Sequence, residues 1–405
     1  MTRDMEKSAD FVARARALAE LLAPGAAARD LERRFAHDEI AEMRKTGLFA
    51  LRGPVERGGG GGAISDFARV VATLAEGDAN VAQMYITHTY GVELMNQVQA
   101  EPTVKDRFYE RLANGLFVTN AYSERGTKTI FDFKTTLERD PAGGWRMNGT
   151  KFYCTGSAGG DVLYASGKVV GREGEDDLTR DLGQIRMVFL ERDWPGVTIH
   201  DDWRGIGQRT TASGTTEFVD VHVPDELCFS TVGLDSPDSL FSIIGQIGFT
   251  AVYVGIAKAA LREGCAFVRE RARAWPHSGV ERAADDPYVL HHVGRMQTLV
   301  SSAEQMLRWA CEAIDEAEFS PSGEARALAS VRVSEAKSVA TEVSLEVSER
   351  IFQVCGAGAA IEKYDLDRFW RDARTLTLHD PVDYKYRLVG EWVLNGTPPP
   401  VTSYT

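Results

Sequence analysis

Hydrophobic residues repeat with one period at the two ends of this 405-residue chain and with another period in its middle. Up to about residue 115 they recur every three or four positions, as Leu18 and Leu22 do, which is typical of amphipathic helices. From about residue 117 to residue 224 apolar and polar residues alternate, which is typical of half-buried strands. The helical period then returns as far as about residue 394. The sequence therefore predicts an α+β protein in which a β domain lies between two helical domains.

The changes of period also predict where the domains meet. We expect an N-terminal helical domain over residues 1–115, a central β domain over residues 116–235 and a C-terminal helical bundle over residues 236–405. Several short strands at regular spacing in the central domain predict a small barrel or sandwich. Asn148 and Gly149 lie there between strand-like residues, and this pair predicts a tight hairpin turn.

Charge and cysteine content limit the classes of partner. A formal net charge of −13 argues against a nucleic-acid partner, because phosphate backbones need a basic surface. The longest apolar stretch, residues 241–261, contains Gln246 and Lys258 and predicts a buried helix instead of a membrane span. The five cysteines are widely spaced without a CxxC pair, so neither disulfides nor a metal site is expected. Since the N-terminus has no apolar signal segment, we expect a cytoplasmic protein without membrane partners.

Two histidines have patterns that suit either structure or chemistry. His88 shares a helix face with Val81 and Met84, so it is either a core histidine with satisfied nitrogens or a polar group presented to a buried pocket. His379 precedes Asp380 near the end of the C-terminal helical block. That pair is either an exposed helix-to-loop junction or a reactive pair, and the residue pattern alone leaves both alternatives open.

Polar and glycine-containing segments carry weaker signals. Asn120 and Ser123 open the β block in a polar run that suits a flat, polar ligand, although ordinary turn formation explains the same composition. Residues 205–207 and 356–358 each contain two glycines, but neither segment follows a strand and opens a helix as a dinucleotide-binding fingerprint requires. We interpret both segments as turns.

The order of the blocks and several sequence strings point to one known family. The chain resembles the acyl-CoA dehydrogenase superfamily over essentially its whole length, on the strings at residues 147–156, 205–209, 213–224, 255–257 and 368–374. Within that superfamily it is most similar to the dibenzothiophene monooxygenase branch, whose two-component members use FMNH2. This likeness rests on Asp202-Trp203, on Asp286-Pro287-Tyr288 and above all on the string Thr377-Leu-His-Asp-Pro-Val382. The resemblance implies a central β-barrel between the two helical domains.

The residues at two positions argue against dehydrogenation. Acyl-CoA dehydrogenases need a carboxylate base that removes the α-proton while hydride moves to the flavin. The string that resembles their glutamate segment contains His379 and Asp380 here. The Asp380 side chain is shorter than that of glutamate, and a proline follows it. The alternative position for the base in some members of the superfamily is Gly245. We therefore expect a different flavin reaction.

The resemblance implies an FMN-dependent monooxygenase. A separate flavin reductase would supply FMNH2, O2 would form a flavin 4a-hydroperoxide, and one oxygen atom would pass to sulfur, nitrogen or an aromatic carbon of a small organic substrate. Such an oxygenated flavin survives only where water is excluded and polar groups hold it. The resemblance also implies a homotetramer and favours FMN over FAD.

The site residues follow from the same resemblance. Its implied catalytic residues are His379, His88 and Asp380, and its implied flavin contacts are Asn120, Ser123, Thr155, Trp203, Arg273 and His379. Arg273 would hold the phosphate, since its guanidinium matches phosphate geometry. The chain departs from the branch at Thr155, where a serine is familiar, and at Gly358, where a phosphate-binding arginine is expected.

Two other functions remain open from the sequence. One is an FAD-dependent acyl-CoA dehydrogenase in which Asp380 is the base. The other is a non-catalytic partner subunit that keeps the fold but binds no flavin. Anaerobic bleaching of bound FAD by an acyl-CoA would favour the first, and absence of flavin binding would favour the second.

Overall fold

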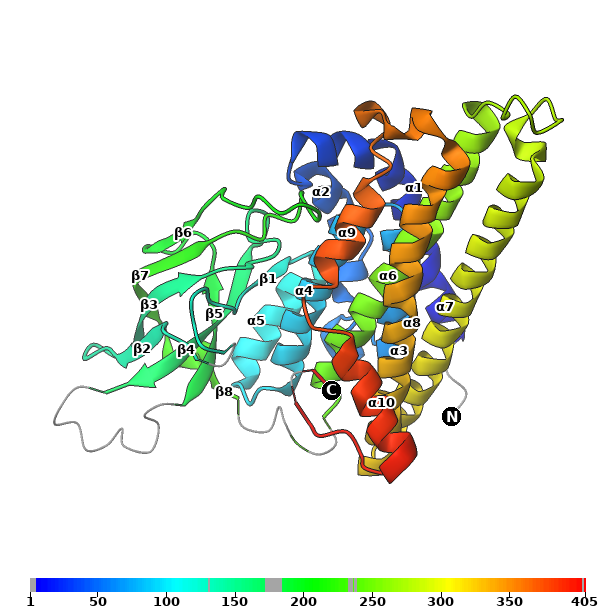
Figure 1. Ribbon diagram of the computed structural model, residues 1–405. Helices are drawn as coiled ribbons and strands as arrows, with labels where there is room; N and C mark the ends of the chain where they lie inside the picture. Colours follow the sequence, from blue (N-terminus) through cyan, green and yellow to red (C-terminus); the bar gives the residue numbers. More distant parts are fainter. Residues whose placement is uncertain (1–4, 130–131, 172–183, 232–235, 237–238, 403) are drawn as a thin grey trace.

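A computed structural model of the chain describes residues 5–129, 132–171, 184–231, 236, 239–402 and 404–405 (Figure 1). Its N-terminal helices are α1 (Met5–Glu32), α2 (His37–Lys45), α3 (Ile64–Ala75), α4 (Ala79–Gln97) and α5 (Pro102–Ala113). The strands that follow are β1 (Val118–Ala121), β2 (Thr136–Arg139), β3 (Trp145–Lys151), β4 (Val162–Val170), β5 (Ile185–Glu191), β6 (Val197–Ile199), β7 (Thr216–Val223) and β8 (Cys228–Ser230). The C-terminal helices are α6 (Phe241–Glu270), α7 (Pro287–Phe319), α8 (Gly323–Cys355), α9 (Arg368–Leu376) and α10 (Asp383–Asn395).

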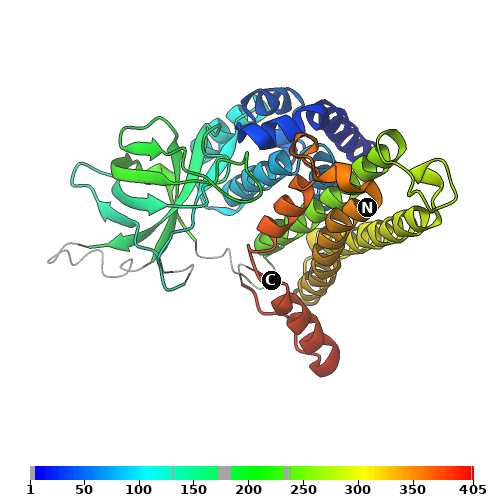
Figure 2. The same cartoon turned by 45° about the horizontal axis from the view of Figure 1, so that its top comes forward.

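The predicted order of helical, β and helical blocks is confirmed. The strands lie at one end of the molecule, and the long helices α7 and α8 lie at the other (Figures 1 and 2). One continuous apolar core joins α1, α3 and α4 with α6, α7 and α8, so the two helical blocks pack as one body. This body holds α9 against the β domain, where the candidate site lies.

Helix α6 is the centre of the helical body. By length and composition it could cross a membrane, but 94% of its most apolar window is buried inside the protein. Its neighbours are α3, α7 and α8, which cover it with aliphatic side chains. The predicted buried helix at residues 241–261 is therefore confirmed.

The β domain is one curled sheet with the strand order β6-β7-β3-β2-β4-β5-β8, and β1 pairs with β4. Most neighbouring strands are antiparallel, whereas β1 and β2 both run parallel to β4. Among the described strands, β6 and β8 end the path and do not pair with each other. The sheet therefore curls around its own apolar cluster and closes against the helices.

The predicted hairpin turn at Asn148-Gly149 is wrong. Both residues lie inside β3, where the pairing with β7 shifts register between Met147 and Gly149. Gly149 has φ of 155°, and a Cβ there would lie 2.4 Å from the Thr135 hydroxyl oxygen. The glycine therefore serves a bulge, while β2 and β3 are joined by the turn at residues 140–144.

Candidate functional site

The loop between β6 and β7, residues 200–215, lies directly on α9. The backbone N–H of Gly207 donates to the Thr375 hydroxyl at 3.0 Å, and the N–H of Gln208 donates to the Asp372 carboxylate. A Cβ at residue 207 would lie 2.0 Å from the carbonyl oxygen of Arg371. Only glycine fits this approach, so the loop is held to α9 by its backbone.

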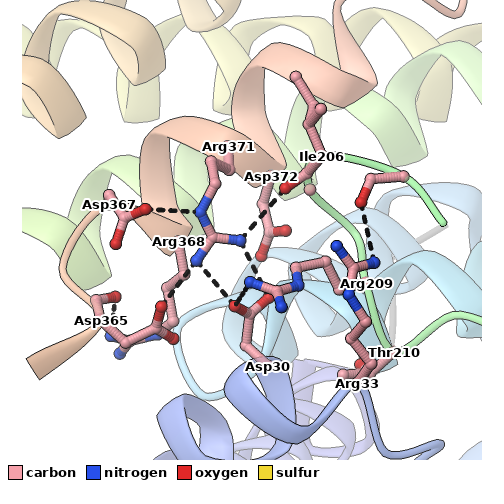
Figure 3. A network of polar contacts seen from close by, with 12 residues as sticks. Asp30, Arg33, Ile206, Arg209, Thr210, Asp365, Asp367, Arg368, Arg371 and Asp372 are labelled. Carbon is pink, nitrogen blue, oxygen red and sulfur yellow. Dashed lines mark hydrogen bonds and ion pairs between the residues drawn. The ribbon is translucent and has the colours of Figure 1, made fainter. Parts of the chain in front are cut away.

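A network of charged side chains surrounds this contact (Figure 3). Arg371 on α9 pairs with Asp30 of α1 at 2.7 Å and with Asp365 at 2.6 Å. It also donates to the carbonyl of Ile206 in the loop, and Arg209 pairs with Asp30 at 3.3 Å. The network ties α1, α9 and the loop together, so elements from all three blocks fix the position of the loop.

Asp372 is a buried carboxylate of this junction. Besides the Gln208 N–H, it accepts a hydrogen bond from the side chain of Asn80 on α4 at 3.1 Å. Asn80 in turn accepts from the N–H of Thr210 at 3.3 Å. Burial, reinforced by the neighbouring Asp30 carboxylate, raises the pKa of Asp372 to about 8. The loop is therefore held from two sides by one buried carboxyl group.

Three hydroxyl groups lie in a row where the loop meets the segment after β3. Thr155 is 2.8 Å from Ser213, and Ser213 is 2.6 Å from Thr211. Thr211 donates to the carbonyl of Gln208, which also accepts from the indole N–H of Trp203 at 2.7 Å. The predicted residues Thr155 and Trp203 are thus joined through the same loop, and Thr155 has a hydroxyl partner that the sequence did not reveal.

Asn120, Tyr153 and Trp203 form an aromatic and polar surface beside this hydroxyl row. The Asn120 amide donates to the carbonyl of Tyr153 at 3.4 Å, while its buried Oδ1 has no partner among the described residues. Tyr153 is 51% exposed, and its backbone has a φ of 61°, in the left-handed region. Its ring lies 6.1 Å from that of Trp203. An exposed ring on left-handed backbone beside an unpaired buried acceptor suits a flat ligand with polar edges. Sequence reasoning missed Tyr153, which stands two residues before Thr155.

Ser123 joins the same region through its backbone. Its carbonyl accepts from the N–H of Phe152 at 2.8 Å, next to Tyr153. The following residue, Glu124, forms a buried ion pair with Lys151 at 2.7 Å and accepts from the N–H of Thr135 at 3.0 Å. The structure therefore brings together four of the predicted flavin residues: Asn120, Ser123, Thr155 and Trp203.

His379 and Asp380 follow directly after α9. Asp380 is buried, pairs with Lys337 of α8 and with Lys385 of α10, and accepts from Nδ1 of His379 at 3.2 Å. Burial alone would raise the pKa of Asp380. The hydrogen bond from His379 and the two lysine charges outweigh burial and hold this pKa far below its ordinary value. The His379 ring packs at 4.3 Å on Phe249. Asp380 is therefore a clamped anion that orients the histidine.

A cavity of about 530 Å³ opens beside His379. It lies between α10 and the C-terminal segment, and apolar groups dominate its wall: Pro381, Tyr384, Leu388, Pro398, Pro399, Pro400 and Tyr404. Its polar members include His379, Asp380 and Lys385. The size and lining suit a small apolar molecule that is presented to His379.

His88 occupies the helical core, away from this cavity. It is fully buried, its Nε2 lies 2.8 Å from the Phe49 carbonyl, and its Nδ1 accepts from the N–H of Val118 at 3.1 Å. Burial lowers the pKa of His88 to about 4, so the ring is neutral. With both nitrogens engaged, His88 has the geometry of a satisfied core histidine that anchors the start of β1, two residues before Asn120.

Arg273 lies apart from the other predicted flavin residues within the chain. It is exposed in the connection between α6 and α7, and this connection lies at the end of the molecule opposite the sheet (Figure 1). There its backbone forms an isolated antiparallel β-bridge with that of Arg282. Together with Arg269, Arg273 also lines a polar cavity of about 570 Å³. The expected arginine position at Gly358 lies near Phe267 and leaves no charge there.

Comparison with known families supports the architecture. Residues 5–116 match the family described as acyl-CoA dehydrogenase, N-terminal domain, and residues 247–384 match acyl-CoA dehydrogenase, C-terminal domain. Dibenzothiophene monooxygenase from Rhodococcus qingshengii is 33% identical over 400 residues, which cover 96% of this chain and 94% of the relative. The probable FMNH2-dependent monooxygenase SfnC from Pseudomonas putida is 30% identical, with 96% of both chains covered.

A solved structure extends the likeness to three dimensions. The FMN-bound form of TdsC from Paenibacillus sp. A11-2 superposes with a TM-score of 0.89 at 32% sequence identity. The alignment covers 98% of this chain and all of TdsC. The similarity therefore includes both helical blocks and the sheet between them.

Proposed function

Because the chain belongs to the acyl-CoA dehydrogenase superfamily, in its dibenzothiophene monooxygenase branch, we propose that it oxidises a small apolar molecule at sulfur in the cavity beside His379. The chain is a two-component, FMN-dependent monooxygenase: a separate reductase supplies FMNH2, and O2 supplies the inserted oxygen. Sulfur as the target rests on the relative named for dibenzothiophene. The observation that carries the proposal is the apolar cavity with a clamped histidine–aspartate pair in its wall.

The same geometry argues against acyl-CoA dehydrogenation. A base must take up a proton, but Asp380 is paired with two lysines and its pKa is held far below the ordinary range. At Gly245 a Cβ would lie 2.6 Å from the ring of Tyr90, so the space that a glutamate needs is occupied. Neither position offers a working carboxylate base.

The described residues fit FMN. Asn120 Oδ1 is a buried acceptor that can receive an N–H of the flavin ring, Tyr153 offers an exposed aromatic face, and the Thr155 hydroxyl lies beside both. Reduced FMN, once bound, supplies the electrons that activate O2. The retained polar and aromatic groups also argue against a non-catalytic partner subunit.

We assign His379 the role of accepting a hydrogen bond from an O–H group in the cavity during oxygen transfer. Asp380 orients its ring, and the wall of the cavity beside the ring is largely apolar. His88 acts indirectly in this scheme, because its two hydrogen bonds hold β1 and hence Asn120 in place. Removal of the His379 side chain would release reduced oxygen as hydrogen peroxide instead of product.

We also propose that the enzyme works as a cytoplasmic homotetramer. Large apolar side chains are exposed on the outer faces of the C-terminal helices: Tyr288, Leu290, Trp309, Phe319, Tyr384, Val393 and Leu394. Such exposed side chains on α7 and on α10 are typical of a self-association surface. A neighbouring subunit would bring its Arg273 to the flavin phosphate, since the connection between α6 and α7 that holds this arginine lies far from the sheet in its own chain (Figure 1). The five free cysteines suit a reducing compartment.

The proposal is tested with the purified protein, FMN, NADH and a flavin reductase in air. A panel of thioethers and thiophenes, with their oxygen and carbon analogues as controls, is followed by mass spectrometry. We expect sulfoxides from the sulfur compounds and little product from the analogues. His379→Ala should retain FMN binding and release hydrogen peroxide in place of product. Anaerobic reduction of bound flavin by an acyl-CoA would contradict the proposal.

A further inference from the structure

Lys337 is a buried lysine that stands behind the His379–Asp380 pair. Its side chain is only 3% exposed, on a stretch of α8 whose other inward residues are small, such as Ala336 and Ala340. Its Nζ pairs with Asp380 and donates to the side-chain oxygen of Gln246 at 2.8 Å. A buried ion pair is weak evidence for stability, because desolvation offsets much of its attraction. The position of Lys337 therefore calls for a role other than stability.

The charges around Asp380 exceed what one carboxylate needs. Lys337 comes from α8 and Lys385 from α10, and the side chain of Lys385 is also nearly inaccessible at 4%. His379 is the third group with a nitrogen at the carboxylate. Burial, reinforced by the charge of Asp380, raises the pKa of the Tyr253 and Tyr404 hydroxyls. Lys337 contacts the same carboxylate oxygen, Oδ1, as Nδ1 of His379, whereas Lys385 contacts the other oxygen, Oδ2.

The ionised carboxylate determines the tautomer of His379. An ionised Asp380 can only accept hydrogen bonds, so the ring nitrogen that contacts it, Nδ1, must carry a proton. In the neutral ring the other nitrogen, Nε2, is then an acceptor. Nε2 has no protein partner among the described residues, and the ring lines the cavity.

We propose that Lys337 is a positioning residue that acts through Asp380: it holds the carboxylate oxygen that faces His379, which keeps the ring proton on Nδ1 and leaves Nε2 free to accept from an O–H group in the cavity. Without Lys337, the carboxylate oxygen that accepts from Nδ1 would lose its lysine partner, since Lys385 contacts the other oxygen. Burial lowers the pKa of Lys337 to about 8, which leaves it mostly protonated at neutral pH. This inference rests on the proposed function only for the reaction in the cavity, since the tautomer is a property of the protein alone.

The first test needs no turnover. Protein labelled with [15N]histidine is studied by NMR at mildly alkaline pH, where an unperturbed imidazole is neutral. The His379 signals are assigned by their loss in His379→Gln. We expect a protonated Nδ1 and an unprotonated Nε2 in the native protein. In Lys337→Met the carboxylate oxygen that faces Nδ1 loses its lysine partner, so we expect both tautomers of His379.

The second test follows product formed per flavin oxidised. Lys337→Met should lower this ratio about tenfold, with hydrogen peroxide as the balance, because Nε2 then accepts in only part of the molecules. Lys258→Met is the matched control, because Lys258 is a half-buried lysine of α6 that pairs with Glu76 and Glu304 away from the cavity. The control should keep the native ratio.

Asp380→Asn keeps the proposal testable if Lys337→Met folds poorly. With the carboxylate removed, Nδ1 no longer faces an obligate acceptor, so both tautomers of His379 should appear. The double variant Lys337→Met/Asp380→Asn should lose no more activity than the worse single variant, because both act on one ring. A native tautomer and a native product ratio in Lys337→Met would overturn the proposal, as would an equal loss in Lys258→Met. A native tautomer without any oxygenase turnover would instead contradict the proposed function.

Discussion

Replacement of Gly207 by alanine tests whether α9 positions the loop that carries Trp203 and Ser213. The added Cβ would lie 2.0 Å from the carbonyl oxygen of Arg371 and 2.6 Å from the backbone nitrogen of Asp372. Both atoms belong to the α9 backbone, so no side-chain rotation relieves the overlap. The loop must therefore move away from the helix.

The cost of that movement can be worked out from the contacts. Overpacking against backbone costs about 1–3 kcal/mol, and separation breaks the hydrogen bonds from Gly207 and Gln208 to α9, worth about 1 kcal/mol each. We expect a loss of about 3–5 kcal/mol, which lowers the Tm by roughly 6–10 °C at about 2 °C per kcal/mol for a large chain. FMN affinity should fall together with the Tm, because the loop also positions Ser213 beside Thr155.

Differential scanning calorimetry measures the Tm, and quenching of FMN fluorescence measures binding. Gly390→Ala on α10 is the matched control, since no described atom outside its immediate neighbours and its own helix backbone lies within 4 Å of the added Cβ. Helix propensity predicts a small gain in stability there. Native melting and native FMN binding by Gly207→Ala would refute the contact between the loop and α9.

Three further changes separate the roles of individual site residues. The effect of Asp372→Asn depends on pH, because the pKa of Asp372 is about 8 in the folded protein and near 4 in the unfolded chain. The native protein therefore loses stability as the pH rises from about 4 to about 8, whereas the variant does not. The Tm of the variant relative to the native protein should rise across this range. His88→Leu leaves the Phe49 carbonyl and the Val118 N–H without partners, so calorimetry should show a loss of about 2–4 kcal/mol. Thr155→Val should weaken FMN binding about fivefold in a fluorescence titration, whereas Thr155→Ser should bind FMN as the native protein does.

The fold was predictable because hydrophobic period reports burial directly. The helical stripes and the alternating strands each identify the face that packs, whatever their partners. Strands β1, β6 and β8 have only three or four residues each, which is too short for alternation to define their bounds. The Asn148-Gly149 turn was wrong because the same pair that suits a hairpin also suits a bulge, and contact with Thr135 decides between them.

The candidate site was predictable only where its residues stand in recognisable strings. Thr155, Trp203 and His379 belong to such strings, and the structure shows how a single loop and α9 connect them. Lys337 and Lys385 resemble ordinary helix lysines in the sequence. Their burial against Asp380 depends on how α8, α10 and the turn after α9 pack together, which no local pattern reports.

The most direct test of the oxygenase assignment is incorporation of 18O from labelled O2. The protein is supplied with FMNH2 and a thioether or thiophene substrate in an 18O2 atmosphere, and the product is analysed by mass spectrometry. A monooxygenase transfers one labelled oxygen atom to each product molecule and requires FMNH2 for every turnover. Product without label, or flavin reduction by an acyl-CoA in the absence of oxygen, would contradict the account.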